Sequence, residues 1–148
     1  MRKENWQNDL SSYLDSVRHT PFDFPTHNCL MFVFGAIEAI TGQDLGEPYR
    51  GKYKDERSAA RLLRKTDNVK TSEELLEKHF GEPKPLAFAR LGDIVFVDPL
   101  NAELELPSDI DLFGPVPGIC YGSVSFFVGE NGLLQFETLR LDKTLWVS

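Results

Sequence analysis

One segment of the chain, residues 28–42, is apolar on almost every side, and it constrains the fold more than any other. It begins at Asn28, whose side chain can accept a hydrogen bond from a free N–H in the first turn of a helix. It ends at Gly42, a residue typical of the position that follows a helix. The apolar residues between them are Leu30, Met31, Phe32, Val33, Phe34, Ala36, Ile37, Ala39 and Ile40. A helix of this kind is normally central and buried, so the rest of the chain has to surround it.

The spacing of apolar residues elsewhere predicts helices first and strands second. A helix is expected over residues 4–18, with one apolar face, and two amphipathic helices over 56–65 and 72–80. After Pro85 the period changes, and five strands are expected, over residues 93–97, 118–121, 124–128, 133–136 and 143–147. This order predicts the α+β class, with N-terminal helices packed on a C-terminal antiparallel β-meander. Residues 99–115 are expected to form a long acidic loop.

Length and charge limit what the chain can do. Its 148 residues fit one domain, residues 1–148. The net charge of -7 disfavours nucleic-acid binding, which depends on neutralising phosphates. The longest apolar run, residues 29–37, is far shorter than a membrane span. The polar N-terminus shows no secretory signal, so we expect folding in a cytoplasm.

The two cysteines and three histidines are too scattered for a structural framework. Cys29 and Cys120 cannot form a disulfide scaffold. His19, His27 and His79 lack the spacing of metal ligands, so we expect no metal and no cofactor. His19 and His79 are expected near helix C-termini, where a partial positive charge is favourable.

Cys29 stands where a helix can activate a thiol. The unpaired N–H groups and the dipole at a helix start stabilise negative charge, and the thiolate is the nucleophilic form. His27, two residues earlier, can add positive charge. A free cysteine is also commonly a small buried apolar residue, and the local sequence leaves both interpretations open.

Several motifs together resemble a peptidase family. The segment from Pro21 to Cys29, followed by an apolar helix, resembles the nucleophile segment of NlpC/P60 (papain-like) cell-wall cysteine peptidases. Residues 92–96 and 116–122 resemble two strands of that family in the same order. The whole chain resembles a phage and prophage family related to these peptidases, whose genes lie among tail genes. The shared features are the leading Trp helix, the His27-x-Cys29 pair, Thr41 to Asp44, Gly51-Lys52-Tyr53, and the terminal Trp146-Val147.

The resemblance places the peptidase base at Val116, and a valine cannot take a proton. A cysteine peptidase needs a base within hydrogen-bond reach of the thiol. Three alternatives follow. His27 serves as the base, provided that it lies in the loop before the helix. Cys120, which has the same strand parity as Val116, faces Cys29 and forms a dithiol. Or the site is inactive.

The resemblance implies a structural or assembly protein of the phage tail, in the tail-tip or hub region of the virion, made in the host cytoplasm. Its partners would be other phage tail proteins, and its peptidase-like fold would be catalytically degenerate. We expect aromatic residues to serve a subunit interface, namely Phe113, Phe126, Phe127, Phe136 and Trp146.

The alternative is an active cysteine hydrolase, an endopeptidase or amidase acting on peptidoglycan during phage entry. Cys29 would be its nucleophile and His27 its base, and the backbone N–H of Cys29 would stabilise the oxyanion. Asp93, directly after Gly92, is expected to be a turn residue in either case.

Overall fold

The computed structural model describes residues 1–98 and 114–147. Four helices come first along the chain: α1 (Trp6–Val17), α2 (Cys29–Thr41), α3 (Glu56–Asp67) and α4 (Ser72–Phe80). Their positions agree with the four helices expected from the sequence. None of the helices in the described ranges is both long and apolar enough to cross a membrane.

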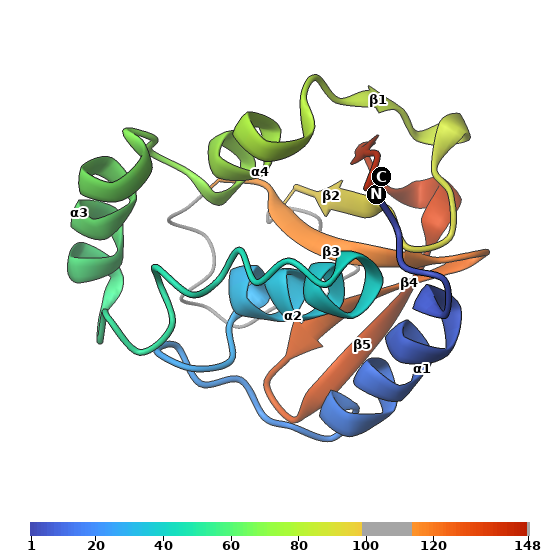
Figure 1. The fold of residues 1–148 in the computed structure, drawn as a ribbon, viewed down its shortest axis with the longest axis horizontal. Helices are drawn as coiled ribbons and strands as arrows, with labels where there is room; N and C mark the ends of the chain where they lie inside the picture. Colours follow the sequence, from blue (N-terminus) through green and yellow to red (C-terminus); the bar gives the residue numbers. More distant parts are fainter. Residues whose placement is uncertain (99–113, 148) are drawn as a thin grey trace.

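A six-stranded antiparallel sheet follows, and Figure 1 shows α2 lying across it. Its strands are β1 (Lys84–Pro85), β2 (Ile94–Val97), β3 (Val116–Tyr121), β4 (Val124–Gly129), β5 (Gly132–Glu137) and β6 (Lys143–Leu145). The order in the sheet is β1-β6-β2-β3-β4-β5. The expected meander is therefore present from β2 to β5, and β6 returns to the other side of β2. The α+β class is confirmed. Most of the acidic loop expected over residues 99–115 lies outside the described residues.

Helix α2 is the centre of the core, as its sequence requires. It contacts α1 on one side and strands β3 and β4 on the other. Asn28 caps it by accepting a hydrogen bond from the Met31 N–H at 2.9 Å, and Gly42 ends it with a φ of 81°. Gly35 allows α1 to approach closely, since a Cβ there would lie 2.2 Å from the Tyr13 hydroxyl oxygen.

The sheet is apolar on both faces. Ile94 and Phe96 point to the helix side, so Val95 and Val97 point to the opposite side. Val95 and Val97 belong to a second cluster, here called the rear cluster, which Cys29 joins from the start of α2. The buried members of this cluster are Cys29, Val95, Val97, Val116, Cys120, Phe127, Phe136 and Leu141.

The aromatic residues that we expected at a subunit interface are mostly internal. Phe126 belongs to the helix-side cluster, and Phe127 and Phe136 belong to the rear cluster. Their rings are buried because β4 is covered on both faces, and because Phe136 lies on the face of β5 that packs in the rear cluster. Trp146 is half-buried, and Phe113 lies outside the described residues.

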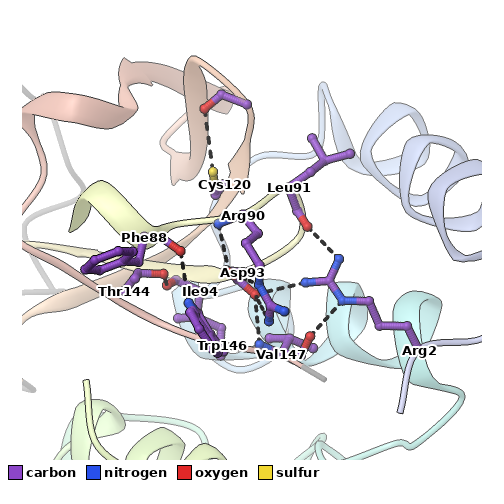
Figure 2. Close-up of polar contacts among 11 residues, drawn as sticks. Arg2, Phe88, Arg90, Leu91, Asp93, Ile94, Cys120, Thr144, Trp146 and Val147 are labelled. Atoms are coloured by element: carbon purple, nitrogen blue, oxygen red, sulfur yellow. Dashed lines mark hydrogen bonds and ion pairs between the residues drawn. The ribbon is translucent and has the colours of Figure 1, made fainter. Parts of the chain in front are cut away.

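Asp93 is more than a turn residue, because its carboxylate is fully buried and joins three parts of the chain (Figure 2). Arg2 donates from Nη2 to Oδ1 at 2.9 Å, and Arg90 donates from Nε to Oδ2 at 3.0 Å. The Val147 N–H donates to Oδ1 at 2.9 Å. Arg2 also donates to the carbonyl oxygens of Val147 and Leu91. The two chain ends are thereby fixed at the start of β2.

The guanidinium groups of these two arginines stack on tryptophan rings. The Arg2 guanidinium lies 4.2 Å from the ring centroid of Trp6. Arg90 lies 4.5 Å from that of Trp146, whose Nε1–H donates to the Phe88 carbonyl at 2.9 Å. Cation–π contact of this kind adds to the ion pairs.

Replacement of Asp93 by alanine should destabilise the fold by roughly 3–5 kcal/mol, since it leaves Arg2 and Arg90 without their buried partner. Urea unfolding followed by circular dichroism measures this. The matched control is Asp9→Ala, which removes an exposed ion pair with Lys3 and should cost about 1 kcal/mol at most. Equal effects of the two substitutions would contradict the role given to Asp93.

Candidate functional site

Cys29 is the first residue of α2, at the position expected from the sequence. Asn28 holds the chain there, because its side chain bonds on three sides. Its Oδ1 caps the helix at Met31, and its Nδ2 donates to the Phe24 carbonyl at 2.7 Å and to the Tyr53 hydroxyl. The loop before the helix and the Tyr53 segment are therefore tied to the start of α2.

The surroundings of the Cys29 thiol favour its neutral form. Burial raises the pKa of Cys29 to about 12, although hydrogen bonds from the backbone N–H groups of Leu30 and Cys29 act in the opposite direction. The N–H groups at the helix start do stabilise the thiolate, as the sequence suggests. In the rear cluster, loss of hydration is the larger effect.

The strand position that resembles the peptidase base offers no proton acceptor. Val116 is 1% exposed and belongs to the same cluster as Cys29. The next residue on that face, Gly118, leaves a space that the Phe127 ring fills. A Cβ at Gly118 would lie 2.6 Å from that ring. This face of β3 is thus packed with hydrocarbon.

His27 lies in the loop before α2, which satisfies the condition set by the sequence for a base. Its backbone forms an isolated bridge with Asp23, and its N–H donates to the Asp23 carbonyl at 2.7 Å. Its ring packs edge-on against Phe32, with the ring centroids 6.4 Å apart. Phe32 belongs to the helix-side cluster, whereas Cys29 belongs to the rear cluster. No hydrogen bond joins the imidazole to the Cys29 thiol within the described part of the chain.

The imidazole of His27 is also unusual in being incompletely bonded. Its Nε2 is buried and has no hydrogen-bond partner among the described residues. Burial lowers the pKa of His27, and the nearby Asp23 carboxylate only partly opposes this. His27 is therefore held as a neutral imidazole.

Cys120 has the strand parity expected of it and shares the rear cluster with Cys29. Its thiol donates to the Gly122 carbonyl oxygen at 3.5 Å. Both cysteines are free and buried. The structure thus brings the two residues into one cluster and shows no disulfide between them.

Sequence reasoning gave no role to Tyr53, although it noted the Gly51-Lys52-Tyr53 loop. The hydroxyl of Tyr53 accepts the hydrogen bond from Asn28, and its ring meets Phe24 edge-on at 5.7 Å. Burial and, to a smaller extent, the nearby Cys29 raise the pKa of Tyr53 to about 12, although the hydrogen bond from Asn28 acts in the opposite direction. Tyr53 is accordingly a polar neighbour of the thiol that does not take up its proton near neutral pH.

The described part of the chain contains no set of side chains typical of a metal-binding site. Within residues 1–98 and 114–147, no group of three or more His, Cys, Asp or Glu side chains is arranged to hold a metal ion. The other two histidines, His19 and His79, are exposed near the C-terminal ends of α1 and α4. Neither lies with Cys29 in the rear cluster.

The comparisons with known proteins identify one family. The model of a family described as a domain of unknown function (DUF6950) matches residues 1–147, so the chain belongs to that family. No curated protein and no solved structure matches the chain.

The buried imidazole predicts a pH dependence of stability. The pKa of His27 is lowered in the folded state, so the unfolded chain takes up a proton first as the pH falls through about 6.5. The contribution of neutral His27 is therefore complete above that pH and is lost below it. We expect His27→Gln to flatten the decline of the unfolding free energy between about pH 7.5 and 5.

The matched control is His19→Gln, at an exposed histidine, which should leave the pH profile unchanged. Urea unfolding at a series of pH values provides the comparison. An unaltered profile in the His27 variant would show that its imidazole is not held neutral.

Proposed function

We propose that this member of the DUF6950 family is a catalytically inactive structural or assembly domain of a phage tail, in the tail-tip or hub region, built on an NlpC/P60-like fold. One observation is the main support for the proposed loss of catalysis. The cysteine at the nucleophile position is buried in hydrocarbon, and valine occupies the position of the base.

The chemistry explains why this arrangement does not support hydrolysis. Burial keeps the Cys29 thiol protonated at pH 7, because it raises the pKa to about 12. General-base catalysis requires an acceptor about 2.6–3.2 Å from the thiol. Val116 and Phe127 supply none. A peptide substrate would also have to displace side chains that form part of the core.

Two features support the peptidase-like ancestry of the fold. A cysteine begins a central helix that packs on an antiparallel meander. The strand that resembles the base strand, β3, belongs to the same meander and shares the rear cluster with that cysteine. The location in a phage tail rests on the resemblance of the whole chain to a family encoded among tail genes. The partners would be other tail proteins.

A specific observation favours the alternative of an active cysteine hydrolase acting on peptidoglycan. Within residues 1–98 and 114–147, the buried Nε2 atom of His27 has no hydrogen-bond partner, and His27 lies in the loop that precedes Cys29. To act as base, the imidazole would have to leave Phe32 and reach the thiol. In that event Cys29 would be the nucleophile, and its own N–H would face the oxyanion.

The inactive site predicts slow alkylation of Cys29. In the folded protein, iodoacetamide should modify Cys29 at least about 100-fold more slowly than an exposed cysteine, with no reactive fraction below about pH 8. Peptide mass spectrometry after a pH series measures the rate at each site. The variant Ser12→Cys supplies the exposed thiol in the same chain. Fast modification of Cys29 at pH 6–7 would favour the hydrolase.

The proposed location makes a separate prediction. Mass spectrometry of purified virions should find the protein, and deletion of its gene should produce defective tails. When the gene with Cys29→Ala is supplied to the deletion mutant, tails should become normal, because in this proposal the thiol takes part in no reaction. Normal tails after gene deletion, or failure of Cys29→Ala with a stable fold, would overturn the proposal.

A further inference from the structure

Helix α3 carries positive charge along one side. Arg57, Arg61, Arg64 and Lys65 are all exposed. Their spacing of four, seven and eight residues from Arg57 places them on one side of the helix. These four residues are here called the α3 cationic face. Ala59 and Leu63, the buried residues of α3, lie on the other side.

These charges are largely uncompensated in the described fold, although hydrogen bonds from Ser58 and, to a smaller extent, the charge of Arg61 lower the pKa of Asp55. None of the four side chains forms an ion pair or a hydrogen bond within residues 1–98 and 114–147. By contrast, Arg50, a few residues earlier, makes two hydrogen bonds of 2.7 and 2.8 Å with Asp44. Asp67, the acidic residue at the end of α3, is already bonded to Lys78 and Tyr49.

The charge of this region is opposite to that of the rest of the chain. Residues 50–67 contain seven basic and three acidic side chains, a net charge of +4. The whole chain carries -7, so the remaining residues carry -11. A positive face on an otherwise acidic chain directs the approach of a partner of opposite charge.

Helix α3 presents this face in a preformed state. Asp55 and Ser58 form a capping box at its start, and Asn68 ends it in the left-handed conformation with a φ of 55°. Two of its twelve residues, Ala59 and Leu63, are buried. Figure 1 shows α3 at one end of the molecule, away from the sheet. The caps stabilise the helix at both ends. Its four exposed cationic side chains are therefore presented in a fixed arrangement to another molecule.

We propose that the α3 cationic face binds an acidic segment of a partner protein. From Arg57 to Lys65 the cations extend over about 12 Å of helix rather than converging on one point. This distribution fits a run of carboxylates better than a single phosphate, and each arginine can pair with a carboxylate through two hydrogen bonds. The inference does not depend on whether Cys29 is inert.

The charge of the rest of the chain selects against larger polyanions. Charges act over about 8 Å at physiological ionic strength, so a short acidic segment contacts mainly the α3 cationic face. A nucleic acid or an anionic membrane is larger than α3, so the net charge of -11 on the rest of the chain repels it. The α3 cationic face also contains no apolar side chain that could enter a bilayer.

The test is fluorescence anisotropy with a labelled peptide of about 12 residues, half of them Glu or Asp, long enough to cover the face. We expect binding that weakens as salt is raised from about 50 to about 300 mM. The triple variant R57Q/R61Q/R64Q should bind about tenfold more weakly. Glutamine keeps the helix propensity, and circular dichroism checks the fold.

The matched control is K3Q/R18Q/K84Q, which removes the same charge outside α3 and should change affinity less than about twofold. The single variant Arg61→Gln, expected to weaken binding two- to threefold, keeps the test valid if the triple variant misfolds. Equal loss in both triple variants, or absence of peptide binding at low salt, would overturn the proposal. Tighter binding to single-stranded DNA or to phosphatidylserine vesicles, dependent on the same arginines, would replace it with a different partner class.

Discussion

The carboxylate of Asp93 joins the chain's N-terminal segment, its C-terminal segment and the start of β2. A charge buried this completely is stabilising only while its partners are in place, because an unpaired carboxylate in the interior costs several kcal/mol. Arg2, Arg90 and the Val147 N–H supply that pairing. The cost of misplacing any of them fixes where the two chain ends lie. It also fixes the start of β2, against which β3 and β6 are aligned on either side.

Short-range patterns predicted most of the fold. The apolar residues of α2 and its two ends at Asn28 and Gly42 each act within a few residues, so the sequence displays them directly. The role of Asp93 depends on partners up to 91 positions away in sequence, and no local pattern indicates such a pairing. Strand β1 was missed for a related reason: it has two residues, one of them a proline, and exists only through pairing with β6.

The candidate site shows the same division between local and tertiary effects. The sequence correctly predicted Cys29 at a helix start and Cys120 on the face of Val116. It set the loop position of His27 as a condition, which the structure meets. A helix terminus contributes about 0.3–1 kcal/mol to a nearby charge. Full burial can shift a pKa by three to five units, which corresponds to roughly 4–7 kcal/mol. Loss of hydration therefore decides the state of Cys29, and it depends on Val116, Phe127 and other residues far away in sequence.

Gly118 determines how the rear cluster packs against β3. A residue without a side chain leaves room beside the strand. Here the Phe127 ring occupies that room, at a distance that excludes even a Cβ. The rear cluster thereby gains a buried aromatic ring beside Val116 and Cys120. Helix α3 lies away from this core (Figure 1) and is held by its own caps, so its charged side is not needed for packing.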